Sequence, residues 1–492
     1  MTSTADADKV AREARDAAPI AAAATPEERG RWLEAIASDL DSHAAELSQL
    51  AATETHIEEA RLLGEIARTT GQLRLFASMV DDGAYVEAII DHADPDATPP
   101  RPDLRRMLIP LGPIAVFAAS NFPFAFSVAG GDTASALAVG CPVIVKAHEG
   151  HPETSRRTAQ IVELALARAG APAGLFTLIE GRDAGIALVQ HPAMAAASFT
   201  GSGAGGRALF DLAAARPDPI PFYAELGSIN PVVITRDAAE QRGAELAAGL
   251  VGSFTLGAGQ LCTKPGVVIV PAGASFAADV RTALVQRAVA PAHLLTDKIG
   301  DAFADGVHEL SGRDGVETVY GNGAGDGSPV LPVVLSTDAE TVISDPEALL
   351  EEHFGPTTLL VSYRSDDELK QLLECLPGSL TATVHAEAQE DVDELVRQLT
   401  PKAGRVLFSG WPTGVAVTWS QHHGGPWPAT TSVHTSVGVT AARRFQRPLV
   451  FQDAPTSVLP SELQEDNPLG IPRRVDGALE VPHLVAAASD PR

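Results

Sequence analysis

Cysteine is scarce in this chain, which has only three among its 492 residues: Cys141, Cys262 and Cys375. No two of them form a Cys-x-x-Cys pair, so neither a disulfide framework nor a structural zinc site is expected. The adjacent His422 and His423 are also poorly spaced for a single ion. We therefore expect a reduced, cytoplasmic protein that holds no metal.

Long apolar runs and basic clusters are missing too. The chain has no uninterrupted apolar stretch of about 18 residues, which a membrane span needs, and its start has no basic region followed by an apolar core, so no signal peptide is expected. Asp and Glu number 63 against 36 Lys and Arg, which gives a formal net charge of −27. A field of that sign repels nucleic acid. We expect neither a nucleic-acid nor a membrane partner.

The chain does contain two kinds of sequence pattern that predict secondary structure. Residues 9–85 place apolar side chains at helical spacing, and Thr25, Pro26 and Glu28 supply the N-cap, first-position proline and capping-box glutamate of a helix start. From Leu104 onward, short β-branched runs alternate with helical stretches, which predicts an α/β fold with parallel sheets buried on both faces. The predicted strands include residues 114–117, 143–145, 175–178, 196–199, 232–234, 267–270 and 358–361.

Residues 201–206 match the Gly-x-Gly-x-x-Gly pattern of dinucleotide-binding loops. They follow an apolar run and precede a helix predicted over 207–215. In such sites a carboxylate about 20 residues further on binds the ribose, and Glu225 stands there. The match comes after several predicted strands, however, and a loop-like Leu-Gly follows Glu225. We interpret Gly201 and Ser202 as cofactor contacts and reject the ribose role for Glu225.

Three residue types suited to acyl chemistry stand in distinctive surroundings. Cys262 lies in the segment Gly-Gln-Leu-Cys-Thr-Lys, Glu225 stands between apolar residues, and Asn121 ends an apolar run. A thiol, a carboxylate and an amide donor suffice for catalysis through a covalent thioester. The apolar setting should raise the pKa of Glu225 toward working pH, as a general base needs. The alternatives are a core cysteine, a surface carboxylate and a turn asparagine; we keep the core role for Cys141 and Cys375.

Seven segments, in order, resemble the aldehyde dehydrogenase superfamily over nearly the whole chain. They are Leu-Gly-Pro-Ile-Ala-Val (111–116), Ser-Asn-Phe-Pro-Phe (120–124), Pro-Val-Ile-Val-Lys (142–146), Phe-Thr-Gly-Ser (199–202), Glu-Leu-Gly-Ser-Ile-Asn-Pro (225–231), Gly-Gln-Leu-Cys (259–262) and Glu-Glu-His-Phe-Gly-Pro (351–356). Residues 124–132 and 423–430 resemble more closely the branch of α-ketoglutaric semialdehyde dehydrogenases and NADP-linked fatty aldehyde dehydrogenases. Residues 421–427 depart, as in that branch, from the usual Pro-Phe-Gly-Gly.

The resemblance implies an aldehyde dehydrogenase-like fold, with a Rossmann-type cofactor domain and an α/β catalytic domain. It also implies NAD(P)-dependent oxidation of an aldehyde to the carboxylic acid. Cys262 would attack the aldehyde, and its backbone N–H with the amide of Asn121 would stabilise the oxyanion. Glu225 would activate the water that hydrolyses the thioester.

The resemblance assigns further residues to the cofactor. Lys146 would bond the adenosine ribose, and Glu149 would accept from the ribose hydroxyls and repel a 2′-phosphate, so we expect NAD rather than NADP. An arginine at 156 or 182 could compensate for that repulsion. Glu352 and Phe354 would hold the nicotinamide ribose and ring.

The resemblance also implies a domain plan and an assembly. We expect a cofactor-binding domain over 1–230, a catalytic domain over 231–425, and a final part, 426–492, that returns to the first domain and carries an oligomerisation strand and a tail. Residues 97–113 should contribute to oligomerisation, with residues 104–109 beside residues near 445–452. We expect a homodimer or homotetramer.

The substrate stays open between two kinds of aldehyde. α-Ketoglutaric semialdehyde needs a cation for its carboxylate, and Arg105, Arg106 and Arg405 are candidates by type. A medium- or long-chain aldehyde would instead need an apolar tunnel, for which Phe124, Phe126, Trp411 and Trp419 are candidates. Two other functions are possible from the sequence. One is a reductase that transfers its acyl group to an acceptor other than water, and the presence of Glu225 argues against it. The other is a non-enzymatic protein with the same fold.

Overall fold

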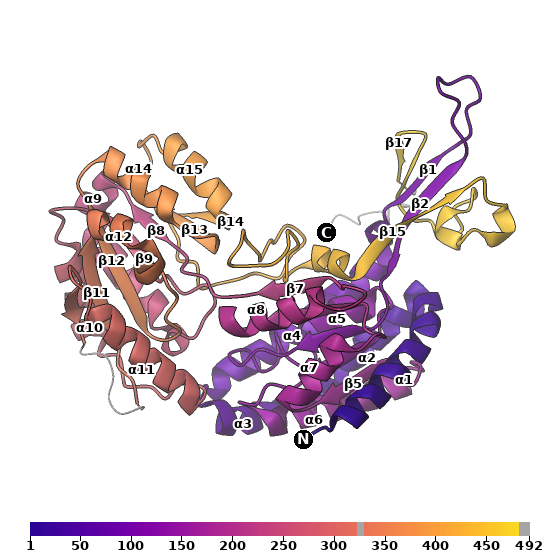
Figure 1. Ribbon diagram of the computed structural model, residues 1–492, viewed down its shortest axis with the longest axis horizontal. Coiled ribbons are helices and arrows are strands. Elements are labelled where there is room, and N and C mark those ends of the chain that lie inside the picture. Colours follow the sequence, from indigo (N-terminus) through magenta and orange to yellow (C-terminus); the bar gives the residue numbers. More distant parts are fainter. Residues whose placement is uncertain (322–328, 482–492) are drawn as a thin grey trace, which may run out of the picture.

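The structure is a computed structural model that describes residues 1–321 and 329–481. Three β-sheets organise these residues: two are flanked by helices, and the third projects as an arm (Figure 1). The α/β class predicted from the sequence is confirmed. Within the described ranges, no helix is both long enough and apolar enough to cross a membrane.

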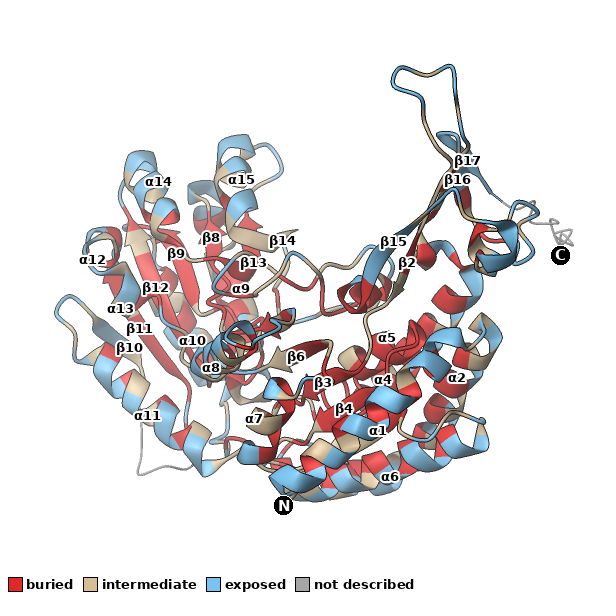
Figure 2. Ribbon diagram, turned by 45° about the vertical axis from the view of Figure 1, so that its right-hand side comes forward, coloured by how far each residue is buried: buried red, intermediate tan, exposed pale blue. Residues whose placement is uncertain are grey.

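Four helices open the chain; the first packs on one face of the first sheet, and the other three pack on the opposite face. They are α1 (Thr4–Ala23), α2 (Pro26–Ser42), α3 (Ala44–Thr55) and α4 (Glu59–Asp82). The helix start predicted from the sequence is confirmed, because the Thr25 hydroxyl accepts from the Glu28 backbone and the Glu28 carboxylate accepts from the Thr25 backbone at 2.8 Å. Figure 2 shows the buried faces of these helices turned inward and their exposed faces outward.

The first sheet is parallel throughout, with the order β5-β4-β3-β6-β7. Its strands are β3 (Ile114–Phe117), β4 (Val143–Lys146), β5 (Phe176–Ile179), β6 (Ala196–Thr200) and β7 (Phe222–Glu225), and its helices are α5 (Gly131–Ala138), α6 (Pro152–Arg168), α7 (Arg182–Gln190) and α8 (Gly203–Ala214). The first strand in sequence lies at the centre, as in a Rossmann fold, which binds ligands outside the carboxyl ends of its strands. The predicted strands of this half are all present.

The second sheet has seven strands in the order β10-β11-β12-β9-β8-β13-β14, and only β10 runs antiparallel to its neighbour. The strands are β8 (Val232–Ile234), β9 (Val267–Pro271), β10 (Glu317–Tyr320), β11 (Val333–Asp338), β12 (Thr357–Tyr363), β13 (Ser379–His385) and β14 (Ala403–Phe408). Its helices are α9 (Arg236–Phe254), α10 (Phe276–Arg287), α11 (Asp297–Ser311), α12 (Ala339–Ser344), α13 (Pro346–Leu349), α14 (Asp366–Cys375) and α15 (Asp393–Leu399). Apolar cores lie on both faces, as predicted for parallel strands.

The arm is a five-stranded sheet in the order β15-β2-β1-β16-β17. Its strands are β1 (Ala88–Asp91), β2 (Leu104–Pro110), β15 (Gln446–Gln452), β16 (Arg473–Val475) and β17 (Ala478–Glu480). The two segments that were grouped from the sequence do pair, since β2 and β15 run antiparallel from Leu104 opposite Gln452 to Pro110 opposite Gln446. Strand β15 is an edge of this sheet, and most of its residues are exposed.

Candidate active site

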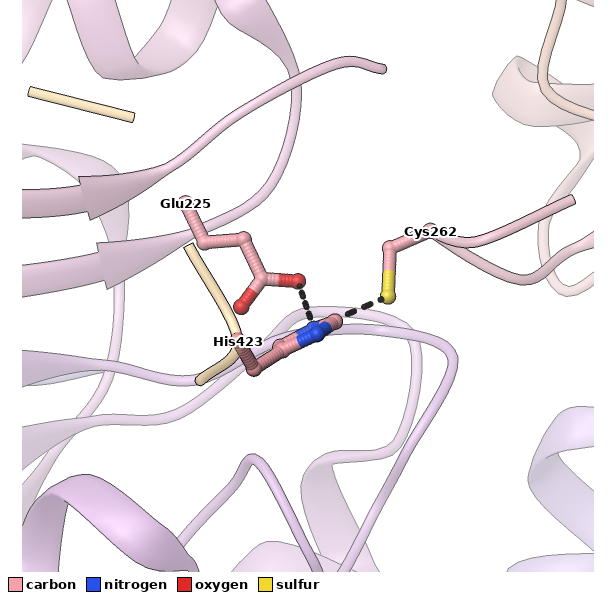
Figure 3. Close-up of side chains that lie close together, drawn as sticks. All are labelled: Glu225, Cys262 and His423. Carbon is pink, nitrogen blue, oxygen red and sulfur yellow. Dashed lines mark hydrogen bonds and ion pairs between the residues drawn. The ribbon is translucent and has the colours of Figure 1, made fainter. Parts of the chain in front are cut away.

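The side chains of Glu225, Cys262 and His423 meet in one cluster (Figure 3). Glu225 is the last residue of β7, Cys262 lies in the loop before β9, and His423 lies in the irregular segment 409–438 that follows β14. The His423 Nε2 atom is 2.9 Å from Glu225 Oε1 and 3.6 Å from Cys262 Sγ. Three distant parts of the sequence thus build one cluster, which brings together two of the three predicted catalytic residues.

The cysteine loop is anchored by Asn230, a fully buried residue. Its amide nitrogen donates to the backbone carbonyls of Cys262 at 2.8 Å and Lys264 at 2.9 Å. Its amide oxygen accepts from the hydroxyls of Ser228 at 2.8 Å and Thr381 at 3.1 Å. The thiol is therefore positioned by a network that ties its loop to β13. Asn230 belongs to the Glu-Leu-Gly-Ser-Ile-Asn-Pro segment, but the sequence predicted no role for it.

Asn121, the third predicted catalytic residue, is buried beside the same loop. Its Nδ2 donates to the carbonyl of Gln260 at 3.0 Å, two residues before the cysteine. An amide NH₂ carries two donors, so one N–H can still point at a developing oxyanion. Arg61 of α4 donates to the Asn121 carbonyl at 2.9 Å and fixes the turn. Asn121 thus lies beside the cysteine loop, and its oxyanion role stays a prediction.

The pKa of Glu225 is lowered, whereas the apolar residues around it in the sequence predicted that it would be raised. Burial does act in that direction, but the charge and hydrogen bond of His423, with hydrogen bonds from Ser436 and Cys262, outweigh it and lower the pKa of Glu225. The Ser436 hydroxyl donates to Oε2 at 2.8 Å. The side chain is thus a buried carboxylate held in its ionised form by donors that lie far along the chain.

The pKa of the Cys262 thiol is raised well above its usual value, first by burial and then by the charge of Glu225. A thiol in this state needs a base before it can attack. The cluster supplies that base, because the imidazole nitrogen of His423 and the carboxylate of Glu225 both lie against the sulfur. The residue itself keeps partial exposure.

His423 was missed as a reactive group by the sequence analysis, which considered it only as half of a poorly spaced metal pair. It is fully buried, its backbone N–H donates to Thr435 Oγ1 at 2.7 Å, and its ring lies 6.2 Å from that of Phe126. The His-Gly-Gly signature at 423–425 was the available signal. The fold also unites thiol, imidazole and carboxylate atoms within 4.8 Å, a donor set that zinc accepts. Spacing along the sequence could not reveal that set.

The predicted adenosine-side contacts lie at the carboxyl ends of the first sheet. Lys146 ends β4, and Glu149 follows it on the surface, close enough for its charge to act on the lysine, whose pKa burial lowers. Gly201 and Ser202 are exposed in the loop between β6 and α8. The Ser202 side chain caps α8 by accepting from the Gly205 backbone at 3.3 Å. Free N–H groups in the first turn of α8 suit a pyrophosphate.

The predicted nicotinamide-side contacts follow α13. The Glu352 carboxylate comes so close to Gly227 that a β-carbon there would lie 2.6 Å from Oε2. Burial raises the pKa of Glu352, and the charge of Lys264 opposes that shift. Lys264 donates to the carbonyls of His353 at 2.8 Å and Thr357 at 2.9 Å. Phe354 is partly buried against the core of the first sheet.

Two of the three arginines that were candidates for binding a substrate carboxylate lie in the arm, away from the cluster of catalytic candidates. Arg105 and Arg106 lie on β2 in the arm, where Asp103 binds Arg105 at 3.0 Å, so neither belongs to the site. Arg405 on β14 donates to two loop carbonyls at 2.8 Å each. Sequence reasoning missed Arg68 of α4, whose charge acts on Cys262 and Glu225.

The aromatic residues proposed for an apolar tunnel are scattered. Phe126 lies against His423, whereas Phe124 is buried in the core of the first sheet. The ring of Trp411 lies 4.8 Å from that of His385, and Trp419 is exposed. The four candidate rings therefore do not gather at one place.

Comparison with known proteins adds independent findings. A model of the aldehyde dehydrogenase family matches residues 1–427. The chain is 47% identical to α-ketoglutaric semialdehyde dehydrogenase 2 of Azospirillum brasilense over 98% of this chain and 93% of that protein. It is 43% identical to α-ketoglutaric semialdehyde dehydrogenase of Acinetobacter baylyi over 92% and 88% of the two chains.

Solved structures support the fold. The NADP-dependent glyceraldehyde-3-phosphate dehydrogenase of Bacillus halodurans, complexed with NADP, superposes with a TM-score of 0.77 at 21% identity and covers 92% of each chain. At that identity the likeness concerns the fold alone.

Proposed function

The chain belongs to the aldehyde dehydrogenase family, and we propose that its substrate is α-ketoglutaric semialdehyde, which it oxidises to α-ketoglutarate. It is an enzyme, an NAD(P)-dependent aldehyde dehydrogenase. The observation that carries the proposed chemistry is the contact of a thiol, an imidazole and a carboxylate at Cys262, His423 and Glu225. The names of the two relatives support the substrate.

The first step that we assign is removal of the thiol proton. The pair formed by His423 and Glu225 carries a net negative charge when the imidazole is neutral, so it can accept that proton and become an imidazolium–carboxylate pair. The sulfur of Cys262 then attacks the aldehyde carbon. The backbone N–H of Cys262 and the second N–H of Asn121 stabilise the oxyanion of the thiohemiacetal.

The second step releases the acid. The chemistry supplied by bound NAD(P) is acceptance of the hydride that leaves the substrate carbon, after which Cys262 carries a thioester. Glu225 takes a proton from water, and the hydroxide so formed breaks the carbon–sulfur bond and yields the carboxylate and the thiol. The buried carboxylate beside the sulfur supports hydrolysis over acyl transfer to another acceptor.

NAD is the cofactor that the adenosine end favours. Lys146, Glu149, Gly201 and Ser202 would hold its adenosine ribose and pyrophosphate, while Glu352 and Phe354 would hold the nicotinamide ribose and ring. Glu149 would repel a 2′-phosphate. The guanidinium of Arg156, which could otherwise receive that phosphate, is bound at Nε by Glu180 at 2.7 Å and at Nη1 by Glu153.

The expected domain plan places the site between two domains, over 1–230 and 231–425, with 426–492 returning to the first. We assign assembly to the arm, because the exposed edge of β15 offers unpaired backbone groups to a second copy of the chain. A homodimer or homotetramer would follow. Three free cysteines fit the reducing cytoplasm, the compartment that we propose.

Steady-state kinetics tests this function directly. We expect the highest kcat/KM with α-ketoglutaric semialdehyde among that compound, succinic semialdehyde and a medium-chain aldehyde, each measured with NAD and NADP. Free carboxylic acid should form without coenzyme A. A tenfold preference for NADP, about 1.4 kcal/mol, would contradict the role of Glu149, and a preference for the medium-chain aldehyde would contradict the substrate.

A further inference from the structure

We propose that Arg68 is the residue that selects the substrate, by binding the carboxylate of an aldehyde held at Cys262. The inference rests on the proposed function and deepens it, since it names the group that distinguishes an anionic aldehyde from a neutral one. Arg68 lies on α4, outside every segment that the sequence analysis connected with catalysis.

Arg68 is partly buried, and one nitrogen of its guanidinium is fully buried without the partner that such a group needs. Its Nη1 atom has no hydrogen-bond acceptor among the described residues, and its contact is with the face of Phe126, 5.3 Å from the ring centroid. A buried donor without an acceptor is unfavourable, and more so when it is charged. An anion placed against this face would satisfy it.

Arg68 is connected to the reacting sulfur through two rings. Phe126, on which it stacks, lies 6.2 Å from the ring of His423, and the Nε2 of His423 lies 3.6 Å from the sulfur of Cys262. After the charge of Glu65, those of Cys262 and Glu225 both act on Arg68. A five-carbon aldehyde, about 5 Å long from its aldehyde carbon to its carboxylate, would extend from the sulfur toward this guanidinium.

Glu65, one turn earlier on α4, does not neutralise Arg68 in a direct pair. Its Oε1 accepts from the backbone N–H groups of Phe124 at 2.8 Å and Ala125 at 2.9 Å. Within the described residues no ion pair of 4 Å or less joins Glu65 to Arg68, although the charge of Glu65 acts on Arg68 from a longer distance. The Nη1 donor of Arg68 therefore remains available to a ligand.

The other buried arginines near the site already donate to protein carbonyls. Arg61 donates to the carbonyl of Asn121 at 2.9 Å. Arg405 donates from Nη1 and Nη2 to the carbonyls of Gly414 and Pro412 at 2.8 Å each. Arg405 does leave its Nε without an acceptor, but its two terminal nitrogens are engaged, whereas the terminal Nη1 of Arg68 has no acceptor among the described residues. A planar guanidinium matches a carboxylate with two parallel hydrogen bonds.

This arrangement also rejects neutral aldehydes. A substrate of the same length with a methyl end would fill the space but leave Nη1 unsatisfied, and sites built around a polar group discriminate strongly against ligands that lack its partner. The selectivity then comes from Arg68 and not from the length of the pocket.

Arg68→Met tests the inference by the ratio of kcat/KM for α-ketoglutaric semialdehyde to that for pentanal. We expect this ratio to fall about 100-fold, the loss expected for a hydrogen bond to a charged group, with partial recovery in Arg68→Lys. Both substrates are measured on the same preparation, so the ratio does not depend on how much enzyme is folded. Arg74→Met is the matched control, since Arg74 lies on the same helix but is exposed and paired with Asp41 at 2.7 Å.

The possible results distinguish a failure of the proposed substrate from a failure of the assignment to Arg68. A wild-type enzyme that shows no preference for the semialdehyde over pentanal would overturn the proposed substrate, whatever Arg68 does. A wild-type preference that survives in Arg68→Met, or that is lost in Arg405→Met instead, would overturn the assignment to Arg68. Equal losses on both substrates in Arg68→Met would show a structural role only and would also overturn it.

Discussion

A single ring nitrogen of His423 faces two partners, Glu225 Oε1 at 2.9 Å and Cys262 Sγ at 3.6 Å. One nitrogen holds one proton, so the three groups share protons and do not carry them separately. The charge on each member therefore depends on the other two. Substitutions at this cluster should be judged by how they redistribute protons as well as by which contact they remove.

His423→Gln keeps a polar side chain but removes the proton acceptor next to the sulfur. We expect kcat/KM to fall about 100-fold, the usual scale of a general-base contribution, and the alkylation of Cys262 by iodoacetamide to slow in parallel. His422→Gln is the control, because that neighbouring ring is only partly buried and belongs to no contact of the cluster described above. Undiminished turnover in His423→Gln would exclude the histidine from the reaction.

The pH dependence of Cys262 alkylation tests the electrostatics. Burial and the charge of Glu225 raise the pKa of the thiol, so the wild-type rate should still be rising at pH 9. Glu225→Gln removes the negative charge, lowers the thiol pKa and should shift this rise to lower pH, while turnover falls about 100-fold with the loss of the hydrolytic base. Slower alkylation at pH 7.5 in this variant would mean that Glu225 activates the thiol more than its charge suppresses it.

At the scale of elements, the sequence predicted best those helices and strands whose formation depends on residues close to one another in the chain. The capping pattern at Thr25 and Glu28 located the start of α2, and the β-branched runs located the strands of both parallel sheets. Helix α8 begins at Gly203 and not near Arg207, because Ser202 caps it and overrides the low helix propensity of glycine.

The parts of the site that the sequence could not predict depend on contacts between distant segments. His423 contacts Glu225 across 198 residues, and Asn230 anchors the loop of Cys262 across 32. Arg68 lies on a helix whose apolar spacing predicts only that it packs. No local pattern reports such contacts, and the pKa of Glu225 was expected with the wrong sign because its decisive neighbours come from this distant chain.

Gly227→Ala tests the loop that connects β7 to β8. A β-carbon at this position would lie 2.6 Å from the Oε2 of Glu352, so the carboxylate must move, and we expect cofactor affinity to fall about tenfold, or about 1.4 kcal/mol. The measurement is the Kd of NAD by tryptophan fluorescence. Gly64→Ala, within α4 and with open space around its would-be β-carbon, is the control and should stabilise the fold by up to about 1 kcal/mol. An unchanged affinity of Gly227→Ala for NAD would mean that Glu352 takes no part in cofactor binding.

At the scale of the whole molecule, the arm presents an exposed strand edge at β15. Val450 on β15 is 50% exposed, and the strand pairs with β2 on one side only within the described chain. A charge on such an edge opposes pairing with a second copy. We expect Val450→Asp to convert the wild-type oligomer into smaller species by light scattering after size exclusion.

Val285→Asp provides the control for this experiment, because Val285 is 65% exposed but lies on α10 at the other end of the molecule. Its mass should match that of the wild type. A monomeric wild type would contradict assembly altogether, and an intact Val450→Asp oligomer would place the interface elsewhere.

The return of the chain from the second sheet to the first also sets the order in which the enzyme becomes reactive during its synthesis. Cys262 emerges 161 residues before His423, a delay of roughly ten to thirty seconds at ordinary translation rates. During that interval the nascent chain carries the thiol without the imidazole beside it. The growing polypeptide therefore cannot acquire its full reactivity toward cellular aldehydes until His423 has been made, and a chain released before that residue is chemically incomplete.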